Sequence, residues 1–399
     1  MKKIDRRSFA ASAGLGVAGA FATPLISRAE ARLPSPPEMK LRPLSKGLAA
    51  MLPKMMALAN VPGVGVAYVE KGRPAWHGEF GVKNAETKAP VTSDTVWQVG
   101  SLSKTVFAYG VMKLAGEGKI DLDRPLAMYV PGELIRDEPR AKLITARHAL
   151  SHSTGLQNWR FQPGENLRLS FTPGEKWSYS GEGIFYLQRA VEQISGQGFA
   201  EFMDEHVLRP LGMTGSSYWW RPDYDKRVAT AHNANGEVAV DYIVQNAPRM
   251  QKLADEWKKP VPSWRAEDLE KAQAEVEKRF PAFPAFFSVN AAGTLFATTS
   301  DYAKFVAAMF DKRLDDMFKA QSHINDTISW GLGWGLQSDR ASTLFWHWGE
   351  GVNYRTFVIG DRIARTAVLV FTNARNGRKI WERIVTDATG ADQLLFLWL

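Results

Sequence analysis

The strand-forming segments of this chain lie towards its two ends, and helical segments fill most of the region between them. Residues 64–69 and 74–82 are rich in β-branched and apolar residues and predict a hairpin. Residues 343–348, 354–359 and 366–371 predict three further strands. Strands so far apart in the sequence are expected to pair in one antiparallel sheet that is covered by helices, with a mostly helical part inserted between them. The expected fold is therefore mixed α/β (α+β).

Helical periodicity supports this arrangement. Apolar spacing predicts helices over 44–60, 183–195, 199–208 and 378–389. Two highly charged helices are expected over 251–258 and 265–280; such charge typically marks a solvated surface, and the alternative is a lid.

The predicted organisation is one large domain with an inserted part. A Pro-rich linker covers 32–43 and the domain covers 44–399. A helical subdomain spans about 121–290, including a charged insertion at about 235–285. A ligand would bind in the cleft between the sheet and this subdomain.

Composition excludes several classes of function. The 399 residues are 45% apolar, enough for a substantial core, and they include no cysteine. Disulfides, thiolate nucleophiles and cysteine metal sites are therefore ruled out. The net charge of +8 is not gathered into a Lys/Arg stripe, so a nucleic acid partner is not expected. No H-E-x-x-H motif or P-loop is present, and no metal or cofactor is predicted.

The first 31 residues resemble an export signal. Basic residues precede an apolar run, and Ala29-Glu30-Ala31 matches a cleavage site. The Arg6-Arg7 pair is typical of twin-arginine signals. The expected location is periplasmic or secreted, with no stable membrane span in the mature form; an uncleaved anchor is the alternative.

Ser101 and Lys104 form a Ser-x-x-Lys pair at the start of an apolar helical segment. Residues three apart share one helix face, and a helix start offers free amides to a developing oxyanion. A serine needs a base to become a nucleophile, and lysine becomes one when burial lowers its pKa. Ser103 is the competing serine, and the alternative for the pair is a capping serine beside an exposed lysine.

The surrounding residues resemble the serine β-lactamase and penicillin-binding protein superfamily. Gly100–Thr105 resembles its first motif. The later segments are similar to the class C β-lactamase-like branch, which includes D,D-peptidases, D-aminopeptidases and family VIII-type carboxylesterases. The matching segments, in the order of that branch, are Leu150–Leu156, Thr172–Ser180, Pro210–Met213, Ala292–Leu295, Thr299–Asp301, Trp330–Trp334 and His347–Gly349.

The resemblance implies roles for individual residues. Ser101 would be the acylated nucleophile, and Lys104 would help to take its proton. Tyr179 would be the partner base and the proton donor to the leaving group. The amides of Ser101 and of Glu350, which follows Gly349, would form the oxyanion hole.

The strand of His347, Trp348, Gly349 and Glu350 would border the substrate, and here the sequence departs from the family pattern. His347 replaces a lysine that recognises carboxylates, and Gly181 replaces an asparagine that holds a substrate amide. Both losses favour an uncharged ester over a β-lactam or a peptide. His347 is alternatively a second acid or base, or only a strand residue. Arg355 and Arg375 are candidate carboxylate contacts.

The sequence therefore predicts an exported serine hydrolase that forms an acyl-enzyme at Ser101 and acts on a small-molecule ester, amide or lactam, with a carboxylesterase on small esters favoured. The alternatives are a D-amino-acid amidase, a D,D-peptidase or weak β-lactamase, and a degenerate binding protein. The apolar segment Leu394–Leu399 is expected to pack on the sheet, the alternatives being a dimer or membrane-surface contact.

Overall fold

The computed structural model describes residues 41–160, 165–277, 289–338 and 343–399. All of them belong to one compact unit, Pro37–Leu399. The predicted signal and most of the predicted linker lie outside the described residues, as does part of the charged insertion. No helix in the described ranges is long and apolar enough to cross a membrane.

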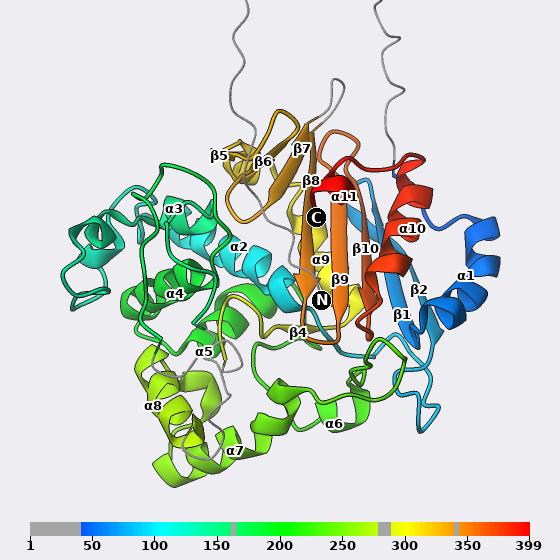
Figure 1. Ribbon diagram of the computed structural model, residues 1–399, viewed down its shortest axis with the longest axis horizontal. Coiled ribbons are helices and arrows are strands. Elements are labelled where there is room, and N and C mark those ends of the chain that lie inside the picture. The colour runs from blue at the N-terminus through cyan, green and yellow to red at the C-terminus, as the bar shows by residue number, and fades with distance from the viewer. Residues whose placement is uncertain (1–40, 161–164, 278–288, 339–342) are drawn as a thin grey trace, which may run out of the picture. The chain divides into compact units, whose positions relative to one another are not determined.

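Eight strands in the described part of the chain form one antiparallel sheet in the order β2-β1-β10-β9-β8-β7-β6-β5 (Figure 1). Both ends of the chain contribute to it, as the sequence predicts, because β1 pairs with β10. A separate two-stranded ribbon joins β3 to β4. The bounds are β1 Gly63–Glu70, β2 Arg73–Gly81, β3 Trp97–Gln98, β4 Phe296–Ala297, β5 Ser322–His323, β6 Ile328–Trp330, β7 Gly335–Ser338, β8 Thr343–Glu350, β9 Arg355–Asp361 and β10 Thr366–Thr372.

The sheet has apolar side chains on both faces. Successive strand residues point to opposite faces, so along β10 Ala367, Leu369 and Phe371 enter one core, and Val368 and Val370 enter the other. The second core is closed by α1 (Lys46–Ala59), α10 (Arg378–Thr389) and the short α11 (Leu395–Trp398). Figure 1 shows α1 and α10 on the same side of the strands.

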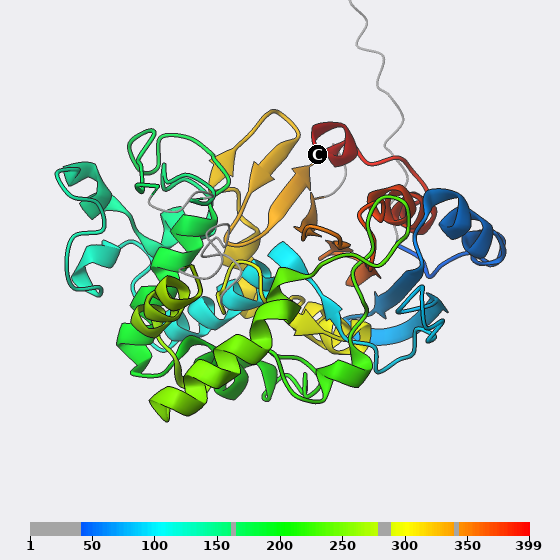
Figure 2. The same cartoon turned by 60° about the horizontal axis from the view of Figure 1, so that its bottom comes forward.

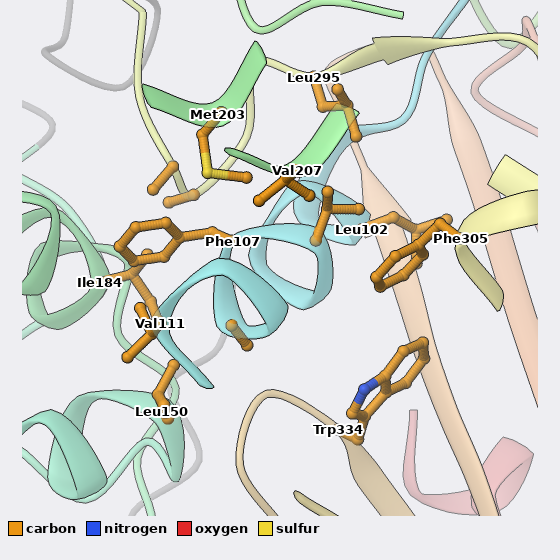
Figure 3. Packing of buried hydrophobic residues seen from close by; sticks show 14 of the residues in the cluster. Leu102, Phe107, Val111, Leu150, Ile184, Met203, Val207, Leu295, Phe305 and Trp334 are labelled. Atoms are coloured by element: carbon orange, nitrogen blue, oxygen red, sulfur yellow. The ribbon is translucent and has the colours of Figure 1, made fainter. Parts of the chain in front are cut away.

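The other face of the sheet carries α2 (Ser103–Gly116) and α9 (Thr299–Ala308). Figure 3 shows Phe107 and Val111 of α2 among apolar side chains from several elements, including Ile184 and Met203. A helix that is apolar on nearly every side must be buried, and α2 is buried over most of its length. This rigid central position fixes the Ser101 end of the helix.

The helical part lies to one side of the sheet, and Figure 2 brings α7 and α8 to the front. The predicted helix over 251–258 is wrong in its start, because α7 begins at Tyr242. The carboxylate of Asp241 accepts hydrogen bonds from the amides of Ile243 and Val244, which caps the helix there.

The bounds of the helices in this part are α3 Ala146–Leu150, α4 Gly181–Ser195, α5 Phe199–Met203, α6 Tyr224–Arg227, α7 Tyr242–Trp257 and α8 Ala266–Glu277.

Candidate active site

Ser101 lies in a single 3-10 turn, Gly100–Leu102, directly before α2. Gly100 has a φ of +55°, a conformation that glycine adopts without strain. A β-carbon at this position would stand 3.0 Å from the amide nitrogen of Glu350. The glycine therefore lets the turn before Ser101 approach the end of β8.

Lys104 is buried, and its Nζ lies 3.0 Å from the Oγ of Ser101 and 2.6 Å from the carbonyl oxygen of Ala292. Burial lowers its pKa from 10.5 to about 7. A large fraction of Lys104 is therefore a neutral amine at neutral pH and can accept the proton of Ser101.

Ser103, the competing serine, is fully buried in the helix packing. Its hydroxyl donates to the carbonyl of Gly100 at 2.6 Å and accepts from the amide of Leu295 at 2.9 Å. Both bonds hold the turn in place, and Ser103 does not line the cavity described below.

Tyr179 lies over Lys104, whose Nζ is 4.8 Å from the centre of the phenol ring. The ring of His152 packs 4.1 Å away, centre to centre, at an angle of 36°. The buried phenol oxygen makes no hydrogen bond of normal geometry to any described residue. Burial raises the pKa of Tyr179, and the nearby Ser101 hydroxyl lowers it by less, so the phenol stays neutral.

His347 is buried on β8 and carries no charge at neutral pH. Its Nδ1 lies 2.7 Å from the carbonyl oxygen of Trp348 and donates to it. The acceptor Nε2 has no partner among the described residues. Burial, reinforced by the charge of Lys104, lowers the pKa of His347 to about 3. The imidazole therefore cannot replace the fixed positive charge of a lysine here.

Gly349 brings β8 against the Ser101 turn. A β-carbon at this position would lie 2.0 Å from the carbonyl oxygen of Val99 and 2.1 Å from the hydroxyl of Thr356, so no larger residue fits. The Thr356 hydroxyl donates to the same Val99 carbonyl at 2.9 Å. This close packing places the backbone of Glu350, whose amide is the predicted second oxyanion donor, beside Gly100.

Gly181 stands where the family pattern has asparagine, and Trp159 fills the missing side chain's space. A β-carbon at Gly181 would lie 2.3 Å from the indole ring. The Gly181 amide donates to the Oδ1 of Asn158 at 2.9 Å. Sequence reasoning missed both Asn158 and Trp159; Gly181 itself is a signal that space is available, but it does not say which residue fills it.

A cavity of about 350 Å³ opens beside Ser101. The described residues that line it include no lysine, arginine or histidine, and two carboxylates, Asp241 and Glu350. Arg355 does not line the cavity; its Nη2 forms an ion pair with Oε1 of Glu350 at 2.8 Å. The lining residues are Gln98, Gly100, Ser101, Asn158, Trp159, Tyr179, Ala231, Val240, Asp241, Tyr242, Ile243, Ala292, Gly293, Trp348, Glu350, Gly351, Val352, Asn353 and Tyr354.

The structure brings together most of the residues singled out from the sequence, but His347 is fully buried and does not line the cavity. Ser101, Lys104 and Tyr179 form one cluster, and Trp348, Gly349 and Glu350 border it from β8. The candidate carboxylate contact Arg375 is exposed and is not among the cavity residues. In the described ranges, no three His, Asp or Glu side chains are grouped so that they could hold a metal ion.

The antiparallel sheet with its helical insertion, together with a Ser-x-x-Lys pair at the start of the central helix, defines the β-lactamase and penicillin-binding protein class of serine hydrolases. The chain belongs to the Beta-lactamase family, whose model matches residues 48–386.

Two relatives of this chain are named for different functions. The chain is 23% identical to "Penicillin-binding protein 4*" of Bacillus subtilis, over 83% of this chain and 72% of that protein. It is 31% identical to "Esterase EstB" of Burkholderia gladioli, over 35% of this chain and 44% of that protein.

Solved structures share the fold. A class C β-lactamase superposes with a TM-score of 0.67 at 16% identity, over 87% of this chain and 95% of the other. A penicillin-binding protein homologue from Pyrococcus abyssi superposes with a TM-score of 0.62 at 21% identity, over 83% and 73%. At these identities the likeness shows the fold alone.

Proposed function

We propose that this chain is a serine hydrolase that forms an acyl-enzyme at Ser101 and acts on uncharged carboxylic esters. The observation that carries the proposal is the 3.0 Å contact between the Ser101 hydroxyl and the Nζ of Lys104, whose pKa is about 7. A buried, partly neutral amine at hydrogen-bond distance is the base that a serine nucleophile requires.

In the first step, Ser101 Oγ bonds to the ester carbonyl carbon and its proton passes to the neutral amine of Lys104. The carbonyl oxygen becomes an oxyanion, for which the amides of Ser101 and Glu350 are the assigned donors. Collapse of this intermediate breaks the bond to the alcohol oxygen, which leaves with a proton. Water then attacks the acyl-serine, releases the acid and restores the Ser101 hydroxyl.

Tyr179 is assigned proton delivery to the leaving alcohol. Its raised pKa keeps it a neutral phenol, so it holds a proton to give, and the resting base is Lys104. The proton that Lys104 takes from Ser101 is the one that restores the phenol after donation, and Lys104 Nζ lies 4.8 Å from the centre of the phenol ring.

Three observations favour an ester over a β-lactam or a peptide with a free carboxylate. No cationic side chain lines the cavity among the described residues, so its lining offers no charge to attract a carboxylate. The neutral His347 offers no charge to a carboxylate. Trp159 occupies the space of the carboxamide that would hold a substrate amide.

The test is covalent labelling with a fluorescent fluorophosphonate, followed by assays with 4-nitrophenyl butyrate and with a chromogenic cephalosporin. Wild type is expected to be labelled and to hydrolyse the ester faster than the lactam. Ser101→Ala should show no labelling, whereas Ser103→Ala, which removes two hydrogen bonds of the turn but keeps the nucleophile, should still be labelled, although more slowly.

Equal labelling of wild type and Ser101→Ala would refute the nucleophile. No labelling of either protein would favour a binding protein of this fold. Turnover of the cephalosporin without measurable ester hydrolysis would overturn the proposed substrate class.

We propose in addition that residues 1–31 direct export through the twin-arginine pathway, on the strength of Arg6-Arg7 and the Ala29-Glu30-Ala31 site.

A further inference from the structure

The mouth of the cavity beside Ser101 carries an unusual set of exposed apolar side chains. Val240, Tyr242 and Val352 are 47%, 44% and 48% exposed, and all three line the cavity. Single exposed apolar residues are ordinary on protein surfaces. Eleven large apolar side chains are exposed in the described part of the chain, and three of them gather at this one opening, which marks a binding surface.

These side chains come from two separate elements. Tyr242 is the first residue of α7 and Val240 lies two residues before it, both in the charged insertion, and Val352 lies in the turn between β8 and β9. Ile243 continues the apolar lining next to Tyr242. The apolar rim, defined as Val240, Tyr242 and Val352, is therefore continuous with the cavity into which Ser101 opens.

We propose that the apolar rim binds an extended hydrocarbon group of the substrate, so that the preferred esters are longer than acetates. This inference rests on the proposed ester hydrolysis and adds the substrate class. A hydrocarbon chain leaving the cavity would cover the three half-exposed side chains and lose its own contact with water. No cationic side chain lines the cavity among the described residues, which favours a chain without a terminal acid group.

The experiment measures kcat/KM for 4-nitrophenyl esters from acetate to decanoate. In wild type, kcat/KM is expected to rise by about two- to fourfold per added methylene until the rim is covered. Val240→Ser and Val352→Ser should each lower the decanoate-to-acetate ratio of kcat/KM by about three- to tenfold. Ile363→Ser changes a side chain that is 82% exposed and does not line the cavity, and it should leave the ratio unchanged.

A second measurement is independent of turnover. Ser101→Ala is titrated calorimetrically with 1-butanol, 1-hexanol and 1-octanol, and affinity should rise with chain length and fall when Val240→Ser and Val352→Ser are added. If no ester is hydrolysed but this binding pattern appears, the proposed ester hydrolysis is wrong and the proposal that the rim binds a hydrocarbon group is retained. The proposed role of the apolar rim would be overturned by ester hydrolysis that does not depend on chain length, or by alcohol affinity that is unchanged in both serine variants.

Discussion

Lys104 couples the chemistry of the site to pH. Its Nζ contacts a hydroxyl and a carbonyl, and burial holds its pKa at about 7. Since only the neutral amine can accept the Ser101 proton, kcat/KM for a neutral ester should rise about tenfold per pH unit below pH about 7 and level off above it. The measurement is a pH profile with 4-nitrophenyl butyrate.

Lys104→Met provides the control for that profile. Methionine fills a similar volume without a base, so turnover should fall by about two or more orders of magnitude. Residual activity should lose the inflection near pH 7. His347 and His152 do not supply a competing inflection, because burial depresses both pKa values and each imidazole stays neutral. A wild-type profile that is flat through neutral pH would contradict the role of Lys104.

At the level of residues, the sequence predicted those site residues that lie close together in the chain. Ser101 and Lys104 share one helix face, and Trp348 to Glu350 share one strand, so their spacing carries the information. The cavity residues Trp159 and Tyr242 were not predicted to line the site, because they reach it from loops and helix ends that only tertiary packing places. The low pKa of Lys104 was expected from its apolar helix, but its contact with the Ala292 carbonyl was not.

At the level of elements, long periodic segments were predicted well and short ones were not. The helix over 378–389 coincides with α10. Strands β5, β6 and β7 were missed because they are only two to four residues long and show no alternation.

The C-terminal segment packs against the sheet, as expected. Leu395 is fully buried in the core to which α10 also contributes, whereas Leu397 is 88% exposed. The ring of Trp398 lies 6.0 Å, centre to centre, from that of Trp348, which in turn lies 5.2 Å from the ring of Tyr179. The short helix α11 therefore supports the aromatic wall of the site from behind.

Trp398→Ala should loosen that wall. Removing one aromatic contact behind Trp348 is expected to lower kcat/KM by about three- to tenfold. The pH inflection should stay near 7, because Lys104 keeps its surroundings. Leu397→Ala, one residue away but directed to solvent, is the matched control and should retain wild-type kinetics. Identical kinetics of the two variants would show that α11 does not position Trp348.

At the level of the whole molecule, the sheet joins the two ends of the chain. Val64 of β1 lies opposite Thr372 of β10, and Val69 lies opposite Ala367. The sequence predicted that the end segments share a sheet, because both contain strands and the middle does not. It could not give the strand order or register, since these depend on contacts between residues about 300 positions apart.

This topology bears on the proposed export. β1 pairs with β10, so the sheet can be completed only after nearly the whole chain has been made. The twin-arginine route carries folded proteins, which fits a chain whose two ends must pair. The pair Arg6-Arg7 is the feature of the sequence that would select this route.

Replacing both arginines, Arg6→Lys with Arg7→Lys, conserves the charge but removes the pair. In a bacterial host with this pathway, the variant should remain in the cytoplasmic fraction as an active, uncleaved protein, because the compact unit Pro37–Leu399 does not include the signal. Wild type should appear outside the cytoplasm with Arg32 as its first residue, read by mass spectrometry of the intact protein. Lys2→Gln with Lys3→Gln lowers the charge but keeps the arginine pair, and it should still be exported. Export of the double-lysine variant at the wild-type level would show that another route carries this protein.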